Sequence, residues 1–210
     1  MAYSSGSKAQ LGMAASGTVA TERYEFLSEN LTLAETIFNS QGIAGNRSQY
    51  SERTRQNIRT VSGSILLHPN SVELDVLLPR ILGAAEVADV FSLAETLPTF
   101  TVVVDRVEKR FYYENCKVNR AIFRAQQGGP LELQLDIEGI DETVNATVFP
   151  TLSISTVGPY MFSDAVLNVV GTPYSFRDFE VVVDNQLIGD RHLNSLTRTA
   201  LPEGGRLAQW

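Results

Sequence analysis

The side chains best suited to chemistry are few in this chain, and they are scattered. His68 lies at the end of a predicted strand and His192 in a polar tail, which argues against a shared metal site. Asp105, Asp136 and Asp141 could supply a carboxylate pair, but carboxylates on one strand face are more often solvated than catalytic. The sequence contains no nucleophile elbow, phosphate-binding loop or dinucleotide fingerprint. We therefore expect no catalytic residues, no metal site and no cofactor, and we expect that the protein is not an enzyme.

The aromatic run Phe111, Tyr112 and Tyr113 is the other candidate for chemistry, as a platform for stacking bases. Base stacking of this kind accompanies a basic groove, whereas this chain has 24 acidic and 17 basic residues and a net charge of −7. Proteins that coat nucleic acid need basic side chains to displace counterions. The charge balance excludes that class but is compatible with a surface past which nucleic acid slides. We predict that the aromatic run packs in the core and at a strand edge.

The length and the cysteine count limit the architecture further. A chain of 210 residues suits one domain with or without appendages. Cys116 is the only cysteine, so no intrachain disulfide can form, and we expect it to be a small buried residue. No apolar run approaches the roughly 20 residues that span a bilayer, so we expect no membrane partner.

The clearest pattern lies in residues 131–140, where apolar and polar residues alternate. Strand side chains point alternately to opposite faces, so the pattern predicts a strand with one apolar and one acidic face. Such a strand is typical of an antiparallel sheet with one packed and one wet side. The polar set is Glu132, Gln134, Asp136 and Glu138. From this strand alone two interpretations stay open: an ordinary solvated surface, or a surface that must stay wet and repel polyanions.

Residues 70–83 carry the only clear helical pattern. Asn70 followed by Glu73 resembles a capping box, and Gly83 provides a stop signal. Apolar residues recur between them at helical spacing, which predicts a stripe that covers the packed face of the sheet. Pro79 lacks a backbone donor and predicts a kink or an irregular last turn.

The rest of the chain reads as strands separated by turns. The predicted strands are residues 24–33, 58–68, 90–93, 99–107, 111–113, 117–126, 147–155, 165–170 and 174–183. Gly63 is expected to mark a β-bulge. Many strands and one helix predict a mainly β protein, a β-sandwich or rolled barrel with one packed α-helix.

Two segments lack such a pattern. Residues 1–23 contain mainly small residues, which predicts an N-terminal arm that is mobile unless a partner orders it. Residues 39–57 predict a long polar loop, a feature that is usually functional or disordered. In or just beyond this loop are four arginines, Arg47, Arg53, Arg55 and Arg59. A cationic loop on an acidic protein favours docking against another copy, although a merely solvated loop stays the alternative.

Several short stretches occur in a particular order, at residues 26–31, 41–47, 61–65, 72–83, 113–119, 129–139, 159–164 and 182–187. None is a sharp motif, but their order and spacing resembles the tail tube protein family of long-tailed bacteriophages. The resemblance implies that residues 24–190 form a β-barrel-like subunit of hexameric rings, which stack into a hollow tube that conducts DNA during genome ejection. It also implies that the rings join their sheets edge to edge.

The resemblance assigns roles to the segments described above. The N-terminal arm and the loop at residues 39–57 would reach the neighbouring ring, and Glu132, Gln134, Asp136 and Glu138 would line the lumen. The partners would be further copies of the chain and other tail proteins, namely the tape measure, terminator and distal tail proteins. DNA would pass through without specific binding. The expected location is the virion tail, after assembly in the host cytoplasm.

Two rival functions stay open. A tail-terminator or connector protein would share the β core and form a single ring, and a β-sandwich module would bind carbohydrate or protein through a cluster at its loop end. Related tail tube chains commonly continue further. The C-terminal segment, residues 191–210, therefore leaves open whether a portion beyond Trp210 belongs to the protein.

Overall fold

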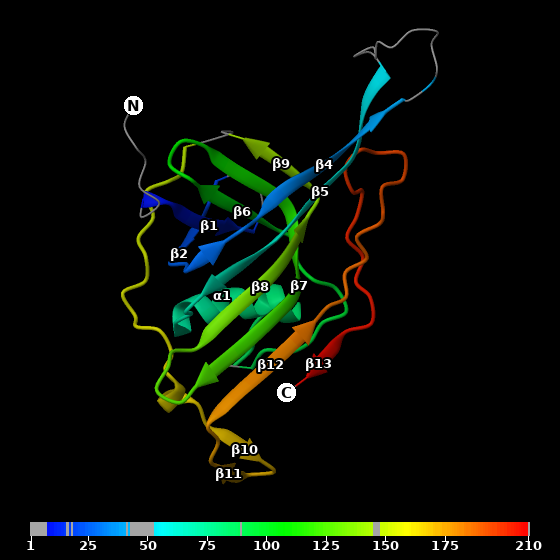
Figure 1. Cartoon of the computed structure of the whole chain (residues 1–210). Helices are drawn as coiled ribbons and strands as arrows, with labels where there is room; N and C mark the ends of the chain where they lie inside the picture. The colour runs from blue at the N-terminus through cyan, green and yellow to red at the C-terminus, as the bar shows by residue number, and fades with distance from the viewer. Residues whose placement is uncertain are drawn as a thin grey trace.

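The computed structural model describes residues 8–15, 17, 19–40, 42, 53–88, 90–144 and 148–209. Strands account for 48% of the chain and helices for 9%. The strands form a large antiparallel sheet that rolls around one α-helix (Figure 1). The predicted fold class, mainly β with a single packed helix, is confirmed.

The strand β7 (Arg110–Gln126) organises the sheet because it belongs to both of its halves. Its first half pairs with β6 (Phe100–Asp105) on one side and β9 (Asp141–Val144) on the other. Its second half pairs with β8 (Glu132–Gly139) and β12 (Asp178–Asp184). One long strand therefore joins two half-sheets.

The other strands extend these two half-sheets. Beyond β6 lie β1 (Gln10–Ala14) and then β2 (Glu22–Tyr24). Beyond β8 lies β5 (Thr54–Leu67), which pairs with both β3 (Ser28–Glu29) and β4 (Thr32–Asn39). At the opposite edge β12 pairs with β13 (Leu207–Gln209), and a short 3₁₀ turn (Phe162–Asp164) precedes a separate hairpin of β10 (Leu167–Val169) and β11 (Thr172–Tyr174).

The helix α1 (Ser71–Leu82) begins and ends as predicted. The side chain of Asn70 accepts a hydrogen bond from the Glu73 N–H at 3.0 Å, and Glu73 Oε2 accepts one from the Asn70 N–H at 3.1 Å. Gly83 has a φ of 100°, and its N–H donates to the carbonyl oxygen of Pro79 at 2.8 Å. The helix continues past Pro79 because the lost donor lies within a last turn that Gly83 closes.

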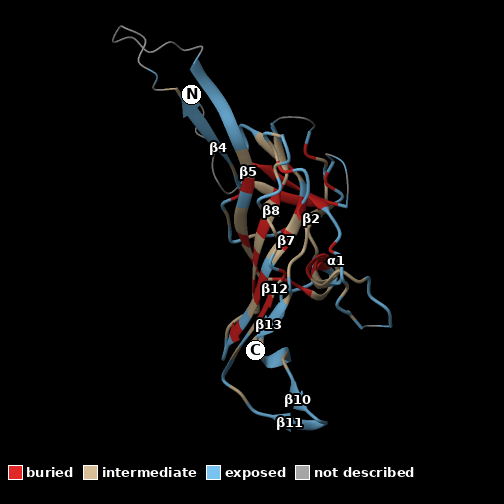
Figure 2. Cartoon of the chain, turned by 90° about the vertical axis from the view of Figure 1, so that its right-hand side faces the viewer, coloured by how far each residue is buried: buried red, intermediate tan, exposed pale blue. Residues whose placement is uncertain are grey.

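The apolar side of α1 packs against the inner face of the rolled sheet, as predicted (Figure 2). The buried core joins the helix to both half-sheets and includes Leu77, Ile81, Val102, Val104, Tyr113, Cys116, Leu133, Leu135 and Ile137. The hydroxyl of Tyr113 donates to the Leu31 carbonyl at 2.8 Å, and so ties the centre of the sheet to the segment between β3 and β4. The aromatic run and the single cysteine therefore serve packing.

The prediction of an N-terminal arm is wrong for the residues that form β1 and β2. Leu11 and Met13 are fully buried, and β1 lies beside β6 along its whole length. Gly12 permits this packing, since a Cβ there would lie 2.6 Å from the Cβ of Ala20. The small residues of this segment were interpreted as a mark of flexibility, but in the structure they allow close packing around β1. Residues 1–7 of the predicted arm lie outside the described residues.

The prediction of a loop over residues 39–57 is wrong at its second end. β5 already begins at Thr54, so Arg55 is a strand residue, while Arg59 lies in the strand as predicted. Residues 35–39 of β4 and 54–59 of β5 form a two-stranded ribbon that extends beyond the body of the molecule, and we call this feature the β4–β5 ribbon (Figures 1 and 2). Arg47 lies outside the described residues.

Other strand predictions are corrected in detail. The strand expected at residues 24–33 is divided among β2, β3 and β4, and residues 148–155 are irregular. Residues 90–93 contribute only isolated bridges. At Gly63 the pairing of β5 with β8 runs without a shift, so there is no bulge there. The glycine is required because a Cβ would lie 2.6 Å from the Cα of Leu31.

Candidate assembly surfaces

The predicted alternation along β8 is confirmed. Leu133, Leu135 and Ile137 are at most 1% exposed, whereas the polar residues between them are partly exposed. The polar side chains therefore share the outer face of the half-sheet, opposite α1. The structure brings Glu132, Gln134 and Asp136 together on this face as the sequence predicted.

The register of β7 and β12 adds positive charge to the same face. Arg124 stands between Glu132 of β8 and Glu180 of β12, with 3.2 Å between Arg124 Nη2 and Glu180 Oε2. Two positions further along the same face of β7, Arg120 stands between Asp136 of β8 and Asp184 of β12. The outer face is therefore a mixed-charge surface with an acidic excess. In the sequence, Arg120, Ile122 and Arg124 alternate with other residues, which indicates that they share one face of β7. Which face this is becomes clear only from the register of β7 with β8 and β12.

Glu138 differs from the other members of its set. Its Oε2 lies 2.8 Å from Nη1 of Arg198, whose side chain is only 9% exposed. Arg198 Nε donates to the Gly189 carbonyl at 2.8 Å, so the C-terminal segment covers Glu138. In the single subunit Glu138 belongs to a buried ion pair, which sets it apart from the predicted row of open lumen residues.

A second ion pair fastens the same segment to β7. Lys117 Nζ lies 2.6 Å from Glu203 Oε1 and donates to the Leu201 carbonyl at 2.9 Å. Partial burial by itself raises the pKa of Glu203, but the hydrogen bonds from Lys117 and the Leu97 N–H outweigh it and leave that pKa below its ordinary value. We call residues 186–206 the C-terminal strap. The two contacts of Lys117 with this strap were invisible in the sequence because they join residues more than eighty positions apart.

The predicted loop arginines have different surroundings. Arg59 pairs within its own chain, with Glu35 at 2.9 Å and Asp141 at 3.5 Å, and its N–H donates to the Leu196 carbonyl at 2.8 Å. Arg53 Nη1 donates to the Gly42 carbonyl at 3.3 Å. Arg55 is exposed and stands opposite Phe38 in the β4–β5 ribbon.

Two strand edges of this half-sheet are unpaired within the described part of the chain. β4 pairs only with β5, and residues 178–181 of β12 pair only with β7. These edges lie on opposite sides of the same polar-faced half-sheet (Figure 1). Each presents free backbone donors and acceptors, which is the arrangement that pairs with another chain.

A model of the family described as phage tail tube protein matches residues 6–209. The chain belongs to this family. A phage tail tube protein is a structural part of the virion tail, which agrees with the resemblance seen in the sequence. No curated protein matches the chain.

Three solved structures are similar to the tail tube chain in part. A chain of an extracellular contractile injection system sheath–tube complex is 4% identical over 66% of this chain and 88% of its own, with a TM-score of 0.42. The tube-terminating cap of the anti-feeding prophage is 8% identical over 70% and 94%, with a TM-score of 0.42. A sheath/tube terminator of an extracellular contractile injection system is 4% identical over 70% and 99%, with a TM-score of 0.43.

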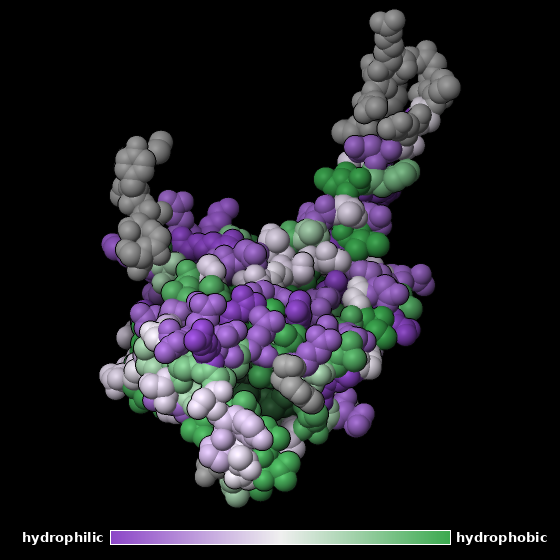
Figure 3. Space-filling model, turned by 60° about the horizontal axis from the view of Figure 1, so that its bottom comes forward, coloured by the Kyte–Doolittle hydropathy of each residue, from purple (hydrophilic) through white to green (hydrophobic). Residues whose placement is uncertain are grey.

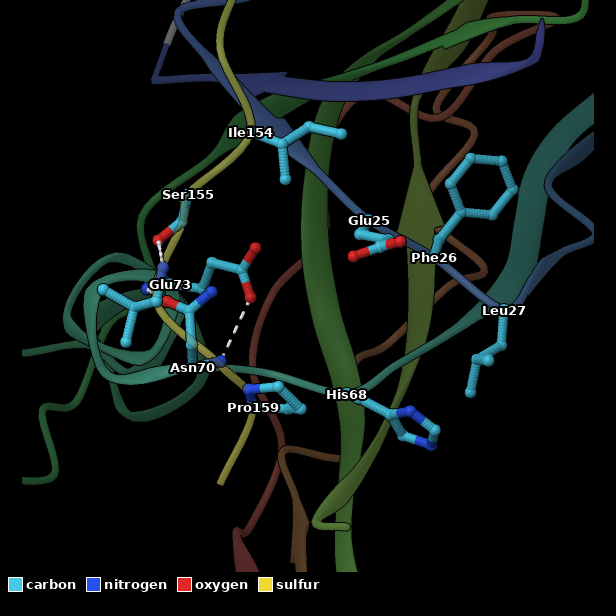
Figure 4. Close-up of a pocket in the computed structure, with 10 residues that line it drawn as sticks. Glu25, Phe26, Leu27, His68, Asn70, Glu73, Ile154, Ser155 and Pro159 are labelled. Atoms are coloured by element: carbon cyan, nitrogen blue, oxygen red, sulfur yellow. Dashed lines mark hydrogen bonds between the residues drawn. The ribbon is translucent and has the colours of Figure 1, made fainter. Parts of the chain in front are cut away.

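Elsewhere the tail tube protein offers little that resembles a chemical site. The described residues contain no cluster of three or more His, Cys, Asp or Glu side chains that could hold a metal ion. His68 lines a pocket of about 230 Å³ beside Asn70, Glu73 and Glu25 (Figure 4). Asn70 and Glu73 are already joined by the capping box, and burial raises the pKa of Glu73. No helix within the described ranges is long and apolar enough to cross a membrane.

Proposed function

We propose that this tail tube protein forms rings of six copies, that the rings stack into a hollow tube, and that the channel conducts DNA during genome ejection. The role is structural and non-enzymatic. The observation that carries the proposal, besides the family, is the pair of unpaired edges β4 and β12 on one half-sheet. A long exposed edge is an aggregation hazard, and a closed ring removes it by pairing the edge of each copy with the next.

The outer face of β8 would then line the channel, with Glu132, Gln134 and Asp136 toward the lumen. Arg120 and Arg124 lie on this face, but each stands between two carboxylates of the neighbouring strands. Strong DNA binding requires basic side chains that neutralise phosphates and release counterions. Arginines already flanked by carboxylates are poorly suited to that, so DNA would stay hydrated and slide.

The β4–β5 ribbon and the loop that includes Arg47 would contact the next ring. At the two ends of the tube the same surfaces would meet other tail proteins, namely the terminator, the distal tail protein and the tape measure protein. We place the assembly of these parts in the host cytoplasm.

Negative-stain electron microscopy of the purified protein at high concentration tests the proposal. Stacked tubes with six-fold end views are the expected result. Isolated rings that never stack would favour a terminator or connector, and monodisperse monomers at every concentration would favour a binding module. Either of the last two outcomes would overturn the proposed function.

A further inference from the structure

An apolar groove lies at the end of the molecule where β7 turns into β8. It is lined by Ala125, Leu131, Tyr160, Met161 and Phe179, with Asp164 at its rim, and its volume is about 210 Å³. Tyr160 and Met161 are 37% and 40% exposed, so the groove is open to a partner. Figure 3 turns this end of the molecule forward and shows apolar patches on its surface.

The walls of the groove are held in place by the fold itself. The Leu131 N–H donates to the Tyr160 carbonyl at 2.8 Å, and the Phe162 N–H donates to the Gly129 carbonyl at 2.9 Å. Behind Phe179, the rings of Phe162, Phe176 and Phe179 form two edge-to-face pairs with centroids 5.1 and 5.8 Å apart. Because the groove is already formed before binding, no conformational entropy is lost in ordering its walls when a partner binds.

The opposite end of the molecule carries the β4–β5 ribbon with its own apolar side chains. Ile37 is 63% and Phe38 is 60% exposed, and Figure 3 shows apolar side chains on this projection as well. A two-stranded ribbon without packing is only marginally stable in water, so large apolar residues on it indicate a binding partner.

The ribbon and the groove match in size and in charge. An apolar cavity of about 150 Å³ can hold benzene, so a groove of about 210 Å³ has room for the ring of Phe38. Among the residues that line the groove, Asp164 carries a negative charge. Arg55, opposite Phe38 on the ribbon, supplies the complementary positive charge.

From this match we infer that the β4–β5 ribbon of one copy inserts Phe38 into the apolar groove of a second copy in the next ring. The ribbon and the groove lie at opposite ends of the folded molecule (Figure 1), so a subunit cannot fill its own groove. A contact between two different surfaces of identical copies builds an open stack when its rotation does not close into a ring. Surfaces at opposite ends of the molecule favour that open arrangement. The inference rests on the proposed function, because it takes the two copies to belong to successive rings.

Two variants separate the two halves of the contact. Phe38→Asp removes the ribbon's apolar side chain, and Met161→Asp places a charge in the groove. Both residues are substantially exposed, and the β4 edge would close the ring through its backbone and not through the Phe38 side chain. Both variants should therefore fold and form rings, but neither should stack into tubes. Val72→Asp is the matched control, since Val72 is 52% exposed on α1, on the other side of the sheet, and this variant should stack normally.

Mixing preformed rings of the two variants gives the sharpest result. Rings with Met161→Asp keep a working ribbon and rings with Phe38→Asp keep a working groove, so the mixture should give pairs of rings that grow no further. A disulfide between Phe38→Cys and Met161→Cys should likewise link successive subunits of tubes into a ladder, whereas Phe38→Cys with Val72→Cys should not. Burial raises the pKa of the native Cys116 thiol to about 12, which keeps it from competing.

The outcomes distinguish this inference from the proposed function. Tubes of normal length from Met161→Asp rings, or tubes of the Phe38→Cys/Met161→Cys variant that yield no disulfide ladder, would show that the ribbon docks elsewhere, while the tube function would stand. A wild-type protein that forms neither rings nor tubes would overturn both.

Discussion

Glu73 stabilises the start of α1, although burial makes the charged form of its carboxyl unfavourable. It closes the capping box of α1, and burial is the main cause of its raised pKa, with Glu25 adding like-charge repulsion. A carboxyl whose pKa is higher in the folded protein favours folding while protonated. That contribution is present below the unfolded pKa and is lost as the pH rises through the folded pKa.

Glu73→Gln should therefore stabilise the subunit at neutral pH, because glutamine also completes a capping box but carries no charge. The gain should disappear below about pH 4, where the glutamate is protonated in both states. Melting temperatures measured across this pH range check the effect, with Asp75→Asn on the exposed side of α1 as control. A gain that grows toward low pH would contradict the argument.

Leu133 tests the inner face of β8 at the same scale. Its side chain is fully buried, and Leu133→Ala should lower the free energy of unfolding by about 2–5 kcal/mol through lost burial and the cavity left behind. The neighbouring Gln134→Ala should change it by no more than about 0.5 kcal/mol. Chemical denaturation of both variants gives the comparison, and equal effects would show that the faces of β8 are misassigned.

At the scale of elements, the C-terminal strap holds the point where β5 and β8 stop pairing. Arg198 pairs with Glu138 and lies 3.4 Å from the carbonyl oxygens of Val61 and Gly139, the last pair of that ladder. Removing its guanidinium leaves Glu138 partly buried without its partner. Arg198→Ala should therefore lower the free energy of unfolding by about 2 kcal/mol.

The control for Arg198 is Arg191→Ala on the same strap, where the side chain is 50% exposed. This variant should leave stability nearly unchanged. Urea titrations of the two variants provide the measurement. If both behave like the wild type, the strap contributes nothing to the joint between β5 and β8.

The elements also show which features a sequence can predict. α1 and β8 follow from local patterns, a capping box and a strict alternation, and both were predicted within a residue or two. β1 was missed because its small residues become informative only beside the valines of β6. Arg59 was grouped with the loop arginines because its ion-pair partners, Glu35 and Asp141, lie on other strands. The mixed charge of the outer face likewise needed the register of three strands.

For the whole molecule, charge reversal on the outer face tests the direction in which it points. Glu132→Lys with Asp136→Lys would place lysines beside Arg124 and Arg120, and make the face basic. The like charges should cost roughly 0.2–1 kcal/mol per cross-strand pair, so the subunit should fold and the tails should assemble. A basic lumen would then hold DNA through phosphate contacts that weaken with salt.

Virions carrying both lysines should eject DNA slowly or incompletely, and higher salt should partly restore the rate. Asp75→Lys, on the exposed side of α1, is the control for an added positive charge away from the channel. Single-particle ejection assays measure the rates. Normal ejection from particles with the double substitution would remove Glu132 and Asp136 from the lumen.

The burial of β1 has a consequence for the chain as it leaves the ribosome. Gln10 pairs with Asp105, so the first strand emerges about 95 residues before its partner. At a synthesis rate of about 5–20 residues per second, Leu11 and Met13 wait roughly 5–20 s for β6, and until then only the short strand β2 can pair with them. A nascent chain with an exposed apolar strand is a natural client for chaperones. Slowing translation between β1 and β6 should lower the soluble yield of the protein, whereas slowing it after β6 should have a smaller effect.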